Sequence, residues 1–338
     1  MARGITVFAA KAVALRAGPR YRFLVFSILF GPTMLHLIDS LHLSTPEVIC
    51  VAVIEAAPDR LIMIDCGPAN VFANVVGELR KRGLDPEHVR ELFATHIHLD
   101  HNGGAWRWQK EFGTIIHVHP KGAPHMVDPT RLVGSATRIY GEQMDYLWGG
   151  IEGIPENAVR ITHDGEVIRT GEVDLQVIET PGHAQHHNAY WLSSERLLFA
   201  GDIAGVAIGG GPILPPCPPP DIDIEAWLSS IGKIEKIDPD RLCLTHFGLF
   251  TDPEFHLKEL SERLIAWAEW IKNALRAGKS EEAIVPEFEQ FAEQQILRSG
   301  IGEKGVAVYE QADPAAMSVT GLSRYWKKHH PEALAVSG

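Results

Sequence analysis

The sequence predicts an α+β fold, in which a mixed domain of strands and helices is followed by a helical C-terminal region. Short apolar runs typical of strands alternate with helical patterns between residues 35 and 250, and beyond Pro253 only helical patterns appear. The composition is globular, since 45% of the 338 residues are hydrophobic and 22% are charged. We divide the chain into a basic segment at 1–33, a mixed domain at 34–252 with an insert at 122–161, and a helical region at 253–338.

Charge and composition exclude several classes of protein. The net charge of −12, from 31 basic and 43 acidic residues, is unfavourable for binding a nucleic-acid backbone. No apolar run approaches the roughly 18 residues of a membrane span, so we expect no membrane partner. Four cysteines without a C-x-x-C pair predict neither a disulfide framework nor a thiolate zinc site. We therefore expect a cytoplasmic protein that acts on a small molecule.

The first half of the mixed domain begins with a predicted hairpin. Two apolar runs, 48–56 and 61–64, are separated by Pro58-Asp59-Arg60, which is typical of a turn between paired strands. The helical pattern that follows ends at Gly83. The elements predicted after this hairpin are a helix at 71–82, a strand at 92–94, a helix at 105–112 and a strand at 114–118.

The segment 122–161 is the least regular part of this domain and has two interpretations. It is either a helical insert that packs its own small core, or a lid over a pocket. In the second case its aromatic side chains, Tyr140, Tyr146 and Trp148, would contact a moderately apolar substrate.

The second half resumes the strand pattern and then gives way to helices. A glycine- and proline-rich stretch at 205–221 predicts a loop without regular structure. Beyond it, apolar residues at helical spacing mark a long amphipathic helix at 257–271. Trp267, Trp270 and Trp326 of the helical region either line a homo-oligomer interface or pack within their own region. The other elements predicted here are strands at 173–179, 189–192, 197–199 and 241–245, and helices at 225–236, 280–298 and 315–328.

Four metal-ligand residues lie within six positions in the motif His96-x-His98-x-Asp100-His101. Residues at i and i+2 do not share a helix face, but in a turn or an extended loop their side chains can converge. Imidazole suits zinc, iron and manganese, and carboxylate extends the choice to harder ions. A catalytic metal needs three or more protein ligands and an open position, which this motif can begin to supply.

Three more candidate ligands follow predicted strands. His183 comes after Thr-Pro-Gly, Asp202 after Phe-Ala-Gly, and His246 after Leu-Thr. Polar side chains that stand where several strands end can meet at one edge of a sheet. The sequence therefore predicts a metal centre at such an edge.

These motifs resemble those of the metallo-β-lactamase superfamily, including its glyoxalase II-like members. The matching pieces are Asp65 in Ile-Asp-Cys-Gly, the motif from His96 to His101 with Gly103-Gly104, Thr-Pro-Gly-His183, Gly-Asp202 and Thr-His246. The resemblance implies an αβ/βα sandwich with helices on its outer faces and metals at one edge. It implies little about the substrate, because one fold hosts many reactions.

The resemblance also implies a ligand set for two divalent metal ions, with zinc preferred and iron or manganese as alternatives. His96, His98 and His183 would hold the first ion, and Asp100, His101 and His246 the second. Asp202 would bridge both ions, and Asp65 would orient the ligands by hydrogen bonds. His186 and His187, close to His183, are candidates for contacts with substrate.

Two activities are open at this point. In the first, a metal-bridging hydroxide cleaves an ester, thioester, lactone or phosphodiester, and Asp100 orients that hydroxide as a catalytic residue. In the second, the chain is a mononuclear iron persulfide dioxygenase of the same fold, which would use His96, His183 and Asp202. The ligand types alone do not separate these activities.

Overall fold

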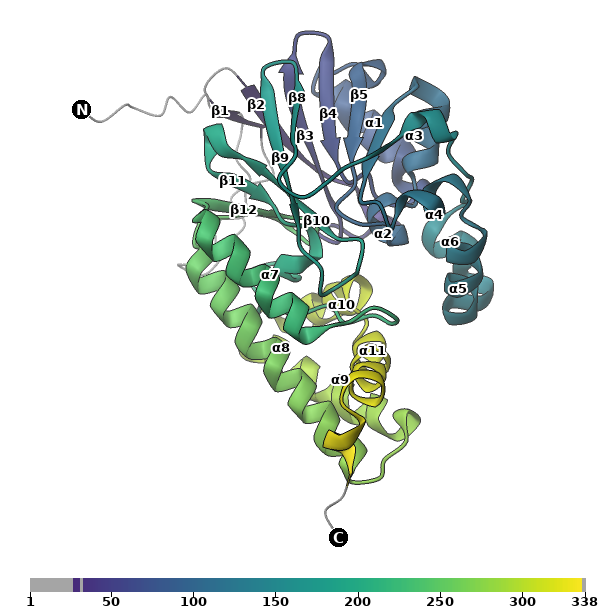
Figure 1. Cartoon of the computed structure of the whole chain (residues 1–338), viewed down its shortest axis with the longest axis vertical. Coiled ribbons are helices and arrows are strands. Elements are labelled where there is room, and N and C mark those ends of the chain that lie inside the picture. The colour runs from purple at the N-terminus through teal and green to yellow at the C-terminus, as the bar shows by residue number, and fades with distance from the viewer. Residues whose placement is uncertain (1–26, 31–32, 336–338) are drawn as a thin grey trace, which may run out of the picture.

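The structure, a computed structural model, describes residues 27–30 and 33–335, and two sheets form its centre (Figure 1). The first sheet has seven strands in the order β1-β2-β3-β4-β5-β6-β7. Its pairs are antiparallel from β1 to β4 and parallel from β4 to β7. The strands are β1 (Ser27–Phe30), β2 (Thr33–Asp39), β3 (Cys50–Ala57), β4 (Arg60–Ile64), β5 (Val89–Phe93), β6 (Ile115–Val118) and β7 (Val159–Ile161).

The second sheet has six strands in the order β13-β12-β11-β10-β9-β8. Only β11 and β12 pair in parallel, and α7 (Ile224–Ile237) connects them. The strands are β8 (Val167–Thr170), β9 (Val173–Glu179), β10 (Asn188–Leu192), β11 (Leu197–Phe199), β12 (Arg241–Leu244) and β13 (Gly248–Phe250).

Strand β3 shows why the sheets form the middle layers of a sandwich. Ala52 and Ile54 belong to the buried cluster shared with the second sheet, whereas Val51 and Val53 belong to a cluster on the opposite face. Successive side chains of a strand point to opposite faces, so a strand covered on both faces is an unbroken apolar run. This is the pattern of residues 48–56.

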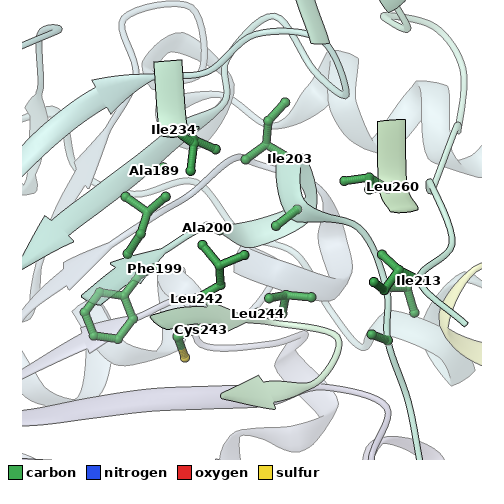
Figure 2. Packing of buried hydrophobic residues seen from close by; sticks show 14 of the residues in the cluster. Ala189, Phe199, Ala200, Ile203, Ile213, Ile234, Leu242, Cys243, Leu244 and Leu260 are labelled. Atoms are coloured by element: carbon green, nitrogen blue, oxygen red, sulfur yellow. The ribbon is translucent and has the colours of Figure 1, made fainter. Parts of the chain in front are cut away.

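Helices cover the outer faces of both sheets. On the first sheet, α1 (Phe72–Lys81) and α3 (Ala105–Phe112) contribute Leu79 and Trp108 to the outer cluster. On the second sheet, α7 and α8 (Pro253–Arg276) place Ile234 and Leu260 near the strand residues Phe199, Leu242 and Leu244 (Figure 2). The layers are therefore helix, sheet, sheet and helix, as the αβ/βα prediction requires.

Two of the four C-terminal helices that the structure describes, α8 and α9 (Glu281–Arg298), begin at a capping side chain. The Asp252 carboxylate accepts a hydrogen bond from the Phe255 backbone N–H at 3.2 Å, and Pro253 opens α8. The helices that follow α9 are α10 (Gly302–Ala312) and α11 (Ala315–His329). Trp267 and Trp326 are buried among these helices, so their rings pack within the chain itself. No helix of the described residues is long and apolar enough to cross a bilayer.

Helices of the C-terminal region also make hydrogen bonds to the proline-rich loop at 205–221. The Tyr309 hydroxyl, on α10, donates to the Pro212 carbonyl at 2.6 Å and accepts from the Ile208 N–H at 2.9 Å. On α11, the Ser318 hydroxyl accepts from the Cys217 N–H at 3.1 Å. The loop contains no helix or strand, as predicted, and has one isolated antiparallel bridge between Val206 and Leu214. These contacts join it to α10 and α11.

The insert is helical in its middle and ends as a strand. It forms α4 (Ala123–Val127), α5 (Thr130–Tyr140) and α6 (Met144–Trp148), and then β7, which pairs with β6. Ala136 and Trp148 pack with Leu99 in a separate small cluster. The basic segment at 1–33 lies outside the described residues except for β1 and the first residue of β2.

Candidate metal centre

The predicted ligands lie where strands end, at one edge of the sandwich. His96 and His98 follow β5, and Asp100 and His101 lie on the short helix α2 (Leu99–Asn102). His183 lies in the connection from β9 to β10, and Asp202 follows β11. His246 lies between β12 and β13. Both sheets thus contribute ligands to one place.

Three overlapping groups of side chains bring their ligand atoms within 4.8 Å of one another. Two of the groups are the two sets that the resemblance implies, and the third joins a member of each set to Asp202. The groups are His96, His98 and His183; Asp100, His101 and His246; and His96, His101 and Asp202.

Asp202 lies between the two sets, and each of its oxygens approaches one of them. Its Oδ2 lies 3.4 Å from the His183 Nε2, and its Oδ1 lies 3.2 Å from the His101 Nε2. On the far side of the second set, the Asp100 Oδ2 lies 3.3 Å from the His246 Nε2. A carboxylate in this position is suited to bridging two cations.

Several ligand atoms lack a hydrogen-bond partner among the described residues although they are buried. These are the Nε2 atoms of His96, His101 and His246 and the Oδ1 atom of Asp202. A buried polar atom without a partner lowers the stability of the fold. A bound cation would give these neighbouring atoms a shared partner. The residues present therefore fit divalent metal ions.

Hydrogen bonds to the other ring nitrogen set the orientation of three histidines. The Nδ1 of His101 donates to the Asp65 Oδ2 at 2.9 Å, that of His183 to the Pro216 carbonyl at 2.8 Å, and that of His246 to the Val48 carbonyl at 2.6 Å. Because Nδ1 carries the proton, Nε2 of each ring presents a lone pair, and not a proton, toward the centre.

Asp65 is fully buried below the ligands and organises the loops that carry them. Its Oδ1 accepts from the Thr95 N–H at 2.8 Å and from the Asn102 side chain at 2.6 Å. Its Oδ2 accepts from His101, from the Thr95 hydroxyl at 2.7 Å and from the Thr245 hydroxyl at 2.9 Å. Three of these partners were missed in the sequence, although each is the neighbour of a predicted ligand: Thr95, Asn102 and Thr245.

Charges in the centre act on the histidines in opposite directions. Burial lowers the pKa of His101, but the carboxylates of Asp202 and Asp100 outweigh this effect and raise its pKa well above the usual value. Burial and the neighbouring His183 lower the pKa of His98 to about 3. The carboxylates thus create a site that attracts positive charge, which a metal ion can supply in place of a proton.

The two histidines after His183 have different positions. His186 lines the cavity next to the metal centre. His187 lies behind His96 with ring centroids 5.2 Å apart, and its Nδ1 is 2.8 Å from the Thr180 hydroxyl. His187 therefore packs against the ring of the candidate ligand His96 and, unlike the expected substrate contact, is absent from the cavity lining.

A cavity of about 480 Å³ opens beside the ligands. Tyr140 and Trp148 line it, as expected for an insert that covers a pocket. Tyr146 does not line it, contrary to the expectation: the residue lies on α6 with 68% of its surface exposed and is absent from the lining. His42, which no sequence signal indicated, stacks on Trp148 with ring centroids 5.6 Å apart and lines the same cavity.

The fold and these residues define a sandwich with a candidate two-metal centre at its edge, and comparisons with known proteins give the family. The sequence model of the metallo-beta-lactamase superfamily matches residues 45–246. The chain belongs to this superfamily.

Two relatives and two solved structures illustrate the similarity. The metallo-beta-lactamase fold-containing protein ST1585 of Sulfurisphaera tokodaii is 27% identical over 67% of this chain and 84% of its own length. A hydroxyacylglutathione hydrolase of Methylobacterium sp. (strain 4-46) is 28% identical over 82% of this chain and 93% of its own.

Among solved structures, that of ST1585 covers 68% of this chain and 86% of its own, with 26% identity and a TM-score of 0.58. The family protein TTHA1429 of Thermus thermophilus covers 87% of this chain and 93% of its own, with 18% identity and a TM-score of 0.58. The second likeness concerns the fold alone.

Proposed function

We propose that this protein is a dinuclear metal-dependent hydrolase that cleaves an ester, thioester, lactone or phosphodiester of a small molecule. The observation that carries the proposal is the position of Asp202 between two ligand groups, one oxygen toward each. Hydrolases of this superfamily and the similarity to hydroxyacylglutathione hydrolases support the reaction class. The histidine-rich donor set favours zinc, with iron or manganese as alternatives.

When bound, two divalent cations supply a water activated at neutral pH and a positive charge that polarises the oxygen of the bond to be cleaved. His96, His98 and His183 would hold one cation, and Asp100, His101 and His246 the other, with Asp202 shared. Asp65 keeps the His101 ring in place through the hydrogen bond to its Nδ1.

Asp100 is the residue we assign to orienting the attacking water. It lines the cavity, so its carboxylate is accessible to an attacking water and to a leaving group. The neighbouring His101 and His246 keep its pKa below the usual range, against the effect of burial. A carboxylate that stays ionised can accept a hydrogen bond from an attacking water and so orient it.

The alternative activity, a mononuclear iron persulfide dioxygenase, would need only His96, His183 and Asp202. These three also lie together, since His96 and Asp202 share one group and His183 is 3.4 Å from Asp202. It leaves the group of Asp100, His101 and His246 without a role, which is why we favour the dinuclear hydrolase.

Elemental analysis of the purified protein, beside a substrate panel, tests the proposal. About two zinc or manganese ions per chain and turnover abolished by a chelator are the expected results. The panel contains an ester, a thioester, a lactone and a bis-aryl phosphodiester, and the best substrate defines the subclass. About one iron per chain, with oxygen uptake on a persulfide and no hydrolysis, would overturn the proposal in favour of the dioxygenase.

A further inference from the structure

We propose that the cavity selects a substrate whose acyl group is apolar and uncharged, and that it discriminates against acyl groups with a distal negative charge. This inference rests on the hydrolase function proposed above and names the substrate class of the same site. It is carried by the two walls of the cavity and by the charges along them.

The first wall is the insert. Helix α5 and the segment after it turn Leu132, Ile139, Tyr140 and Leu147 toward the cavity. Ile139 is 45% exposed, whereas Leu132, Tyr140 and Leu147 are partly buried against a small cluster. An exposed aliphatic side chain beside a reactive centre gains hydrophobic free energy when an apolar group covers it.

The second wall is formed by the proline-rich loop and the start of α11. Four prolines of the loop line the cavity, followed by Pro314 and Met317 from the helical region. Proline has no backbone N–H, so this wall has few donors with which to bind a carboxylate or phosphate. The contacts of Tyr309 and Ser318 hold the loop against α10 and α11, which keeps this apolar surface in place.

The charged residues that line the cavity also favour an uncharged acyl group. Besides the candidate ligands, three acidic residues line it: Asp221, Glu310 and Asp313. Arg131 is the one lysine or arginine among the described lining residues, and its side chain is exposed at the rim. Along these walls a substrate with an additional carboxylate would therefore find one cationic side chain, Arg131, with which to pair.

Asp313 gives the clearest sign of this environment. Its residue is 6% exposed, and its Oδ2 is buried without a hydrogen-bond partner among the described residues. Burial, followed by the carboxylates of Asp202 and Glu310, raises the pKa of Asp313 well above its usual range. Burial that opposes ionisation of a resident carboxyl also opposes entry of an anionic one.

The test uses hydroxamates, whose shared head group binds divalent cations and whose chains differ. Titration calorimetry on the metal-loaded protein would compare acetohydroxamate, butyrohydroxamate, octanohydroxamate and the monohydroxamate of suberic acid. The affinity should rise about two- to fourfold for each added methylene that the cavity buries. Octanohydroxamate should bind at least about tenfold more tightly than the suberic compound, which has a similar length and a terminal carboxylate.

Equal affinities along the alkyl series, or equal or tighter binding of the suberic compound, would overturn the inference while leaving the hydrolase intact. If no hydroxamate bound, acetohydroxamate included, the metal centre itself would be wrong, and this inference with it. The binding readout does not need turnover, so the two failures are distinguishable.

Two matched variants locate the effect. Ile139→Asp should weaken octanohydroxamate binding about tenfold or more and leave acetohydroxamate within about twofold, since only the longer chain reaches α5. Ile265→Asp makes the same change on α8, where Ile265 is 46% exposed and outside the cavity lining, and should change neither. An equal loss in both variants, or none in Ile139→Asp, would contradict the proposed position of the acyl chain.

Discussion

The buried carboxylate of Asp65 accepts a hydrogen bond from the Nδ1 of His101 at 2.9 Å, and with it orients the nitrogen that faces the metal centre. Asp65 is 36 positions from His101 in the sequence. Its carboxylate also accepts hydrogen bonds from Thr95, in the loop after β5, and from Thr245, in the loop after β12. One carboxylate therefore holds the His101 ring and, at the same time, a loop from each of the two sheets.

Substitution of Asp65 should therefore act through the metal. Asp65→Asn replaces one acceptor oxygen by a donor that faces other donors, so we expect metal affinity to fall about 10- to 100-fold. Competition with a chromophoric chelator measures this loss. Excess metal should restore activity. Unchanged metal affinity in a folded variant would contradict the role of Asp65.

Asp202→Asn should reduce bound metal and lower hydrolysis by about 100-fold or more, because one carboxylate serves both ligand groups. Metal content per chain and kcat/KM on the best ester are the measurements. Asp174→Asn is the matched control, since Asp174 pairs with Arg169 on the exposed face of β8 and β9. Near-native turnover in Asp202→Asn would reject the site.

Removal of metal should destabilise the fold, because the buried ligand atoms would lose their ionic partner. If the metal is present at about 100 times its Kd, binding stabilises the protein by about 2.7 kcal/mol. Thermal unfolding with and without a chelator should show a lower Tm for the stripped protein, and added zinc should reverse it. Equal melting temperatures would show that the ligand cluster binds no ion.

Because His256 is buried, we expect the free energy of unfolding to fall at mildly acidic pH. Burial lowers its pKa to about 4, while the Nε2 donates to the Ala204 carbonyl at 2.7 Å. The unfolded chain takes up a proton near pH 6.5 and the folded chain only near 4, so stability is full above 6.5 and falls as the pH drops toward 4. The difference is worth up to about 3 kcal/mol.

Urea unfolding between pH 7 and pH 4 measures this effect, with His256→Gln as the comparison. The difference in unfolding free energy between the two proteins should shrink as the pH falls. A constant difference would mean that His256 does not titrate in this range.

Tyr309→Phe tests whether α10 holds the proline-rich loop. The substitution removes one donor and one acceptor bond and leaves the Ile208 N–H without that partner. We expect a loss of about 1–3 kcal/mol in unfolding free energy and a higher KM with little change in kcat. Tyr146→Phe, at a residue 68% exposed and outside the cavity, is the control. An equal effect of both substitutions would contradict the role of this contact.

Elements with a strong local pattern were predicted closely. The structure places α3 at Ala105–Phe112, β9 at Val173–Glu179 and β11 at Leu197–Phe199, the ranges expected from the sequence. The strands β7, β8 and β13 and the helix α10 were missed. β7 and β13 have three residues each, so their pairing with β6 and β12 decides their conformation more than their own pattern does.

The sequence by itself determined the superfamily and the set of candidate ligands, because ligand residues at fixed short spacing and at strand ends survive as a linear pattern. It could not determine the cavity. His42 and Asp313 line the same space although they lie near opposite ends of the chain, and Tyr146 points away from it although its neighbours face it. Only the packing of α5, α10 and α11 around the sheet edge decides which side chains meet there (Figure 1).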